Sequence, residues 1–284
     1  MRVPVLVGIA VLTVMVGACS RATVDKAVVT NRTFASPRQV VGASGMVVAS
    51  SAAEVRFCSG PFALTWGPPH CSPGIKVTGV NLSRLSYRAS SDGVTWGSAY
   101  LAGTFRDGIL RVTEQGRPKP DNTELQLVEP PCPAPAGGWA TAAQNDLSTK
   151  AVSTYRRQFP ADVTSVAIFR PTPTAWVVTV ASTNPRRTLA RLSSAYPDRL
   201  CVVRSRYQLS SVRSASAAAQ ALLSPIRYGQ PPYRITGVGL TTGTDGQPIV
   251  DVSVVADTTA LRRALASEPA GLVRIVPWLQ PVAR

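Results

Sequence analysis

Runs of strand-forming residues alternate with amphipathic helical segments through the second half of the chain. A first unit has the pattern of helices at 142–158 and from Thr183 to just before Pro197, with strands at 163–169, 175–181 and 200–205. A second unit has the pattern of helices at 212–223 and from Asp257 to just before Pro269, with strands at 234–240, 248–255 and 272–276. Each unit therefore has the order α-β-β-α-β, which predicts a three-stranded sheet with two helices on one face.

The two units match each other at a constant offset of 72 positions, without gaps. Identical residues at this offset include Pro160 and Pro232, Thr164 and Thr236, Val166 and Val238, Val178 and Val250, Val180 and Val252, Leu189 and Leu261, Arg191 and Arg263, and Leu200 and Leu272. Because the helix and strand signals stay in phase with these identities, the pattern predicts two tandem αββαβ repeats, over 140–210 and 211–284.

A region of short β runs precedes the repeats, over 51–130. Its runs of strand formers lie at 55–58, 75–80, 94–96, 99–105 and 109–113, and Arg106-Asp107-Gly108 between the last two is a hairpin signal. This number of strands predicts a small β barrel or sandwich. The segment from Gly103 through Asp107-Gly108 to Thr113 resembles strands of OB-fold-like barrels in exported proteins, and it also fits any β-meander. The fold class predicted for the whole chain is α+β.

Two segments have the composition of connections. Residues 131–139 are rich in Pro and Gly, which predicts a linker and the main domain boundary. Residues 19–50 are rich in Ser, Thr, Ala and Val, which predicts a tether, although Val40-Val41 and Met46-Val47-Val48 are candidates for a first strand.

The N-terminal residues have the pattern of an export signal. Val3 to Val16 is almost wholly apolar, uncharged and too short to span a bilayer, which takes about 20 residues. Val16-Gly17-Ala18-Cys19 resembles a bacterial lipobox. The resemblance implies that residues 1–18 are a signal peptide, and that fatty-acyl chains such as palmitate on Cys19 anchor the protein to the extracytoplasmic face of the cell membrane. The alternatives are an ordinary cleaved secretory signal and a retained membrane helix.

Four further cysteines, an even number in an exported chain, predict two disulfides. Of the three possible pairings we favour Cys58 with Cys71, because both lie in one turn-rich stretch, and Cys132 with Cys201. Metal binding is the rival interpretation, and it lacks ligands, because His70 is the one histidine and no Cys-x-x-Cys pair occurs.

The chain is strongly basic, with a net charge of +15 that falls to +14 once Arg2 leaves with the signal peptide. This charge favours anionic partners, which outside a cell are phospholipid headgroups or phosphorylated wall polymers rather than nucleic acid. The arginines are scattered singly or in pairs such as Arg156-Arg157, Arg186-Arg187 and Arg262-Arg263, so a diffuse solvated charge is the simpler interpretation.

No set of residues predicts catalysis, a metal site or a cofactor site. The carboxylates are scattered, no Gly-x-Ser-x-Gly elbow or phosphate-binding glycine loop occurs, and His70 beside Cys71 is not by itself a catalytic pair. Trp66 and Trp96 are candidates for a ligand-binding face, although tryptophans more often belong to a core.

The αββαβ order resembles two exported modules, the BON module, which is implicated in binding anionic phospholipid, and the ring-building module of secretion systems. The resemblance rests on topology and duplication over 140–284, and the glycines expected around the BON strand pair are largely missing. We therefore favour a non-catalytic, lipid-anchored envelope protein that interacts or assembles with other envelope proteins. The first alternative is a binder of anionic phospholipid or wall polymer, and the second is an unrecognised envelope enzyme. Steep salt dependence would favour the first alternative over the assembly role.

Overall fold

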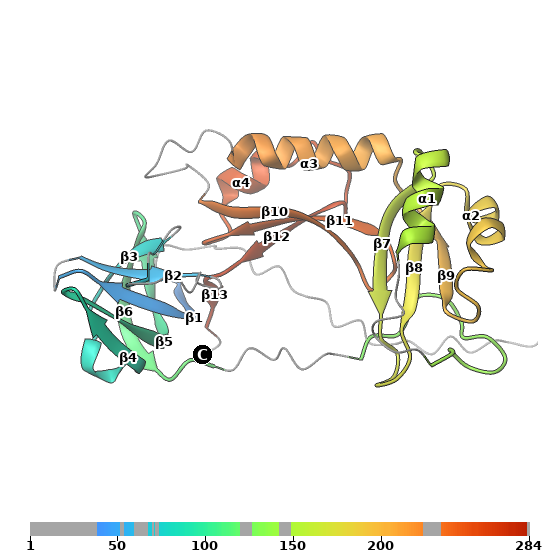
Figure 1. Ribbon diagram of the computed structural model, residues 1–284. Coiled ribbons are helices and arrows are strands. Elements are labelled where there is room, and N and C mark those ends of the chain that lie inside the picture. The colour runs from blue at the N-terminus through green and yellow to red at the C-terminus, as the bar shows by residue number, and fades with distance from the viewer. Residues whose placement is uncertain are drawn as a thin grey trace, which may run out of the picture. The chain divides into compact units, whose positions relative to one another are not determined.

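The structure is a computed structural model that describes residues 39–51, 54–59, 68–69, 71, 74–119, 127–141, 149–223 and 234–282 (Figure 1). The predicted signal peptide and Cys19 lie outside the described residues, as do Trp66 and His70. The predicted α+β class is confirmed, since helices and three separate sheets are present. Among the described residues, no helix has both the length and the apolar character needed to cross a membrane.

The largest sheet contains seven strands in the order β13-β1-β2-β3-β6-β5-β4. Its strands are β1 (Val40–Ala49), β2 (Val55–Cys58), β3 (Gly74–Thr78), β4 (Ser86–Ser91), β5 (Val94–Arg106), β6 (Ile109–Gly116) and β13 (Gln280–Pro281), and the short 3₁₀ helix η1 (Leu82–Arg84) precedes β4. β1 also pairs with β5, from Val40 opposite Thr104 to Ala49 opposite Thr95. This pairing closes β1, β2, β3, β6 and β5 into a ring, which we call the barrel, and β3 and β6 are parallel in it.

The interior of the ring is packed with aliphatic and aromatic side chains. Because neighbouring residues of a strand point to opposite faces, alternate residues such as Val47, Phe57, Ile75, Leu101 and Leu110 point inward and are almost completely buried. Each side chain of this kind stabilises the fold by roughly 1.5–3 kcal/mol when it leaves water. This core is what holds the ring closed.

Several strands of the ring differ from the sequence prediction. β1 covers Val40–Ala49, so the end of the predicted tether (19–50), except Ser50, forms a strand, and Val40-Val41 and Met46-Val47-Val48 belong to it. The runs predicted at 94–96 and 99–105 form one strand, β5. β4 was not predicted, because it is an edge strand whose residues are nearly all exposed and carry no hydrophobic alternation.

The second half of the chain contains two further sheets. The first unit consists of α1 (Lys150–Gln158), β7 (Val163–Phe169), β8 (Val177–Ser182), α2 (Pro185–Leu192) and β9 (Leu200–Arg204). The second unit consists of α3 (Leu209–Leu223), β10 (Ile235–Thr242), β11 (Pro248–Val254), α4 (Thr259–Ala264) and β12 (Val273–Pro277). In each sheet the first two strands are antiparallel and the last two are parallel.

The predicted linker at 131–139 is not a free spacer. Cys132 forms a disulfide with Cys201 of β9, and Trp139 packs in a cluster with Phe169 and Val177 of the first sheet. Neighbouring residues of a strand point to opposite faces of a sheet. Val178 and Val180 pack against the helices, so Val177 and its cluster lie on the opposite face of this sheet. The disulfide therefore fastens the segment before the first unit to its last strand. The predicted pairing of Cys58 with Cys71 is present as well.

The end of the chain belongs to the barrel rather than to the second unit, which was predicted to run to residue 284. Trp278 donates a hydrogen bond from its indole nitrogen to the Ser44 carbonyl oxygen (3.1 Å). Its ring packs at a tilt against the Phe57 ring, with the ring centroids 4.6 Å apart. Leu279 is fully buried in the barrel core, and β13 pairs with Val41 and Gly42 of β1. Two residues carry too little pattern to be predicted as a strand.

Candidate functional site

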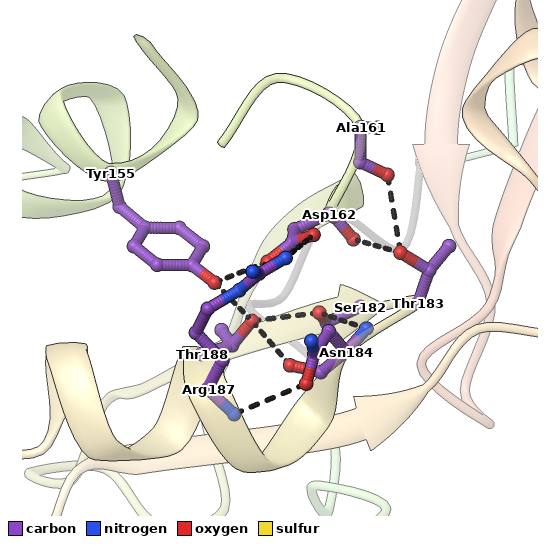
Figure 2. Close-up of polar contacts among 8 residues, drawn as sticks. All are labelled: Tyr155, Ala161, Asp162, Ser182, Thr183, Asn184, Arg187 and Thr188. Atoms are coloured by element: carbon purple, nitrogen blue, oxygen red, sulfur yellow. Dashed lines mark hydrogen bonds and ion pairs between the residues drawn. The ribbon is translucent and has the colours of Figure 1, made fainter. Parts of the chain in front are cut away.

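The most extensive buried polar network among the described residues joins the two helices of the first unit (Figure 2). At its centre Asp162, which directly precedes β7, is 5 % exposed. Arg187 of α2 donates two hydrogen bonds to this carboxylate, from Nε to Oδ2 (2.9 Å) and from an Nη to Oδ1 (2.6 Å). A buried carboxylate needs such a partner, because an unpaired charge removed from water is costly.

Tyr155 brings α1 into the same network. Its phenol donates a hydrogen bond to Asp162 Oδ2 (2.5 Å), and its oxygen lies 3.0 Å from the Thr188 hydroxyl. Burial raises the pKa of Tyr155, and the hydrogen bond to Asp162 raises it further. The hydrogen bonds from Arg187 outweigh the opposing effect of burial, so the pKa of Asp162 is lowered. At neutral pH the network therefore holds a neutral phenol and a carboxylate.

The start of α2 is fixed by side chains that cap its backbone. Asn184 accepts a hydrogen bond from the Arg187 backbone N–H (3.3 Å), Pro185 occupies the first turn, and the Thr188 hydroxyl lies 2.7 Å from the Ser182 hydroxyl. The helix start predicted at Thr183-Asn184-Pro185 is confirmed. Because Arg187 and Thr188 follow directly, the cap sets the angle at which they reach Asp162.

An open groove of about 570 Å³ lies beside this network, between α1 and α2. Its lining includes the buried side chains of Tyr155, Leu192 and Tyr196, and polar groups from Thr154, Gln158, Lys150 and Arg191. Tyr155 thus contributes to both structures, since its hydroxyl holds the network and its side chain lines the groove. The network sets the spacing of the two helices that form the groove.

The helices around the groove carry an excess of positive charge. α1 and α2 contain Lys150, Arg156, Arg157, Arg186, Arg187 and Arg191, and neither helix contains Asp or Glu. Arg187 is neutralised by Asp162. Arg156, Arg186 and Arg191 are exposed and form no ion pair within the part of the chain that the structure describes. An anionic group at this surface would meet several cations whose charge is not already used.

The network ties α1 and α2 to the residue that precedes β7. Asp162 accepts three hydrogen bonds, two from Arg187 and one from Tyr155, so both of its oxygens are engaged. Among the described residues, no group of three or more His, Cys, Asp or Glu side chains has the arrangement of a metal site. What the arrangement can do is hold two basic helices at a fixed distance around a partly apolar floor.

The residues singled out in the sequence are only partly brought together here. Arg186-Arg187 and Arg156-Arg157 lie on the two helices that line the groove, whereas Trp96 lies half-buried on β5 of the barrel. The grouping of Tyr155, Asp162 and Arg187 was missed, because these residues are 7 and 25 positions apart and nothing in a single sequence pairs them. In the sequence, Asp162 is one of several scattered carboxylates and nothing distinguishes it from the others.

Comparison with known proteins gives no family assignment for this chain. The chain matches no protein-family model, and no curated protein matches it.

Proposed function

We propose that this chain is a non-catalytic protein of the bacterial cell envelope that binds an anionic, phosphodiester-bearing ligand on the α1–α2 surface. The observation that carries the proposal is the charge of that surface. Of the arginines on its two helices, Arg156, Arg186 and Arg191 are exposed and form no ion pair among the described residues, whereas Arg187 is paired with Asp162. The groove between the helices adds an apolar floor and a polar rim, a combination suited to an amphipathic anion.

We further infer that the protein is exported and held at the extracytoplasmic face of the membrane by lipid on Cys19. The lipobox-like Val16-Gly17-Ala18-Cys19 supports this address, and the disulfides Cys58–Cys71 and Cys132–Cys201 support it independently, since disulfides persist in oxidising compartments. In that setting the available phosphodiesters are anionic phospholipid headgroups and phosphorylated wall polymers.

We infer the finer architecture from strand order. The ring β1-β2-β3-β6-β5, with its parallel β3–β6 pair, has the pairing order of an OB-type barrel, which supports that assignment for residues 40–116. The shared element order and the 72-residue offset support the interpretation of the two later units as copies of one module. No functional residue is transferred from BON or ring-building modules.

The test is a titration of the full chain, purified in a neutral detergent, with two probes: nanodiscs containing phosphatidylglycerol and soluble poly(glycerol phosphate). The variant Arg156→Gln/Arg186→Gln/Arg191→Gln removes three charges from the α1–α2 surface. Since each basic side chain near an anionic surface contributes about 1 kcal/mol, we expect a loss of roughly 100-fold in affinity.

A matched control removes the same charge from exposed arginines of the barrel and of the second unit, Arg111→Gln/Arg117→Gln/Arg263→Gln. We expect less than about a threefold loss for this control, because none of these arginines lies on α1 or α2 and the attraction between exposed charges is screened with distance. Equal losses for both triple variants would show that binding follows net charge alone and would refute the proposed surface. The probe that binds more tightly identifies the source of the phosphodiester.

A protein–protein role is the second candidate, and a specific feature favours it. Ile168 of β7 and Leu240 of β10 occupy equivalent positions 72 residues apart, and both are large apolar side chains left exposed. A contiguous exposed apolar surface marks a contact site, and β7 and β10, which carry these two residues, contact each other. Substituting both with Ser would abolish assembly without altering anion binding if this role holds, which crosslinking at the membrane would reveal.

A further inference from the structure

Tyr87 is the most exposed large apolar side chain among the described residues, at 88 %. Its backbone has φ 51°, in the left-handed region that costs a bulky residue conformational energy. The other non-glycine residues with positive φ are Asp92, Asp107, Asp198 and Arg234, and aspartate tolerates this region far better. An aromatic residue held in strain, with its ring in water, contributes nothing to the barrel core.

The backbone around Tyr87 is built to present it. Between Ser86, which pairs with Ser98, and Ala89, which pairs with Trp96, the register of β4 shifts by a β-bulge. Opposite the bulge lies Gly97, where an added Cβ would come within 2.8 Å of the Ser86 carbonyl oxygen and of Leu85 Cβ. Glycine is therefore required at this position for β4 to approach so closely, and bulges of this kind redirect side chains.

Trp96 lies beside the bulge, on the outer face of the barrel. Along β5 the buried core residues are Ala99 and Leu101, so residues of the opposite parity, Trp96 among them, point outward. Trp96 is half-buried, and its cross-strand neighbour Ala89 is two residues along β4 from Tyr87. The strand next to β4 therefore carries a second aromatic residue at the level of the bulge that contains Tyr87.

The charge at this edge is positive. Arg84 at the end of η1 and Arg88 next to Tyr87 are both exposed, and neither forms an ion pair with any residue that the structure describes. The other residues of β4 have small side chains: Ser86, Ala89, Ser90 and Ser91. β4 also lies at the end of the seven-stranded sheet, so one side of it is open.

We propose that Tyr87, Trp96, Arg84 and Arg88, the barrel-edge site, bind an acidic glycan. Aromatic rings stack against the C–H faces of sugars, and guanidinium groups form paired hydrogen bonds with carboxylates. A protein partner is disfavoured, because the hot spots of protein interfaces sit in desolvated apolar surroundings and Tyr87 is flanked by polar, exposed residues. The proposal is independent of the ligand bound between α1 and α2.

The test is affinity chromatography of the full chain, in a neutral detergent, on immobilised polygalacturonate, with dextran and polyphosphate as separate matrices. The decisive variant is Tyr87→Gly. Glycine adopts φ 51° without strain, so the thermal midpoint of unfolding should stay the same or rise, while binding to polygalacturonate falls about tenfold. Tyr87→Phe, which keeps the ring, should retain binding. A purely structural tyrosine would instead lower the midpoint on change to glycine and leave binding intact.

The role of charge is tested with Arg84→Gln/Arg88→Gln against the control Arg111→Gln/Arg117→Gln, which removes the same charge from exposed arginines of β6 and the segment after it. The first pair should lose about tenfold in binding and the control pair less than about twofold. The proposal is overturned if Tyr87→Gly binds polygalacturonate like the unsubstituted protein, if both arginine pairs lose equally, or if Tyr87→Gly weakens binding to polyphosphate as strongly as binding to the glycan.

Discussion

The first and second units contain the same elements in the same order, yet different interactions hold their helices in place. In the first unit, Tyr155 of α1 and Arg187 of α2 meet at the buried Asp162. In the second unit the position 72 residues after Asp162 is Arg234, whose guanidinium lies 5.9 Å from the Phe105 ring of the barrel. A change of charge at one equivalent position thus separates a helix–helix network from a contact with the barrel.

The second unit uses local substitutes for the missing network. Asp257, which is buried and lies just before the α4 cap, pairs with Arg262 of α4. Thr258 caps the helix by accepting a hydrogen bond from the Leu261 backbone N–H. The helices of this unit contain three arginines, Arg213, Arg262 and Arg263, one of them neutralised. The comparison teaches that one element order supports two surfaces of different charge, and only the first is strongly basic.

The largest difference in stability should come from the disulfide that only the first unit has. Cys132→Ser/Cys201→Ser opens a loop closed across a sequence separation of 69, and chain-entropy arguments give a loss of about 4 kcal/mol in the free energy of unfolding. Urea titration measures this loss. Since the disulfide fastens residues 127–141 against the first sheet, hydrogen exchange in β9 should rise more than in β12. Equal rises in both strands would contradict a staple specific to the first unit.

The next effect should come from the carboxylate at the centre of the network. Asp162→Asn leaves Arg187 without its counter-charge, and we expect a loss of about 2–3 kcal/mol at pH 7, against at most about 1 kcal/mol for the more exposed Asp251 when changed to Asn. Urea titrations of both variants measure the two losses.

The same variant has a pH signature with a defined sign. The pKa of Asp162 is lowered in the folded state, so its stabilisation is complete above the unfolded value of about 4 and is lost as pH falls below it. The stability gap between the unsubstituted protein and Asp162→Asn should therefore narrow as the pH falls below about 4. A gap that stays constant down to pH 2 would contradict the ion pair with Arg187.

The smallest effect should come from removing one hydroxyl. Tyr155→Phe deletes the hydrogen bonds to Asp162 and Thr188 and should cost about 1–1.5 kcal/mol, whereas Tyr207→Phe, which deletes an exposed hydrogen bond to the Ala270 carbonyl, should cost about 0.5 kcal/mol. Because the pKa of Tyr155 is raised, the unsubstituted protein alone should lose this stabilisation as pH rises above about 10. Thermal unfolding between pH 7 and 11 follows both effects, and equal costs for the two variants would argue against a special role of Tyr155.

Sequence patterns predicted those parts of the fold whose residues are periodic and locally determined. β7 and β2 have the bounds predicted for them, and α2 begins where its capping residues indicated. β4 and β13 were missed, because an exposed edge strand has no hydrophobic alternation and a two-residue strand exists only through its pairing with β1. The predicted Cys132–Cys201 disulfide pins the predicted linker at 131–139 to β9, whereas its proline and glycine content did not indicate that Trp139 packs on the sheet.

The candidate site was predictable only in its charge. The arginine pairs at 156–157 and 186–187 were visible in the sequence, and their placement on two neighbouring helices was within reach of the helix prediction. The network beneath them was not, because it depends on the angle between helices and sheet. Likewise, no local signal indicated the left-handed backbone of Tyr87, which depends on the close approach of β4 to Gly97.

The most direct test of the proposed function is hydrogen exchange of the full chain, in a neutral detergent, with and without saturating anionic probe. A ligand bound between the first unit's helices should slow exchange in Lys150–Gln158 and Pro185–Leu192 and leave Leu209–Leu223 and Thr259–Ala264 unchanged. Protection of equal size in the helices of both units, or of the second unit alone, would contradict the assignment of anion binding to the α1–α2 surface.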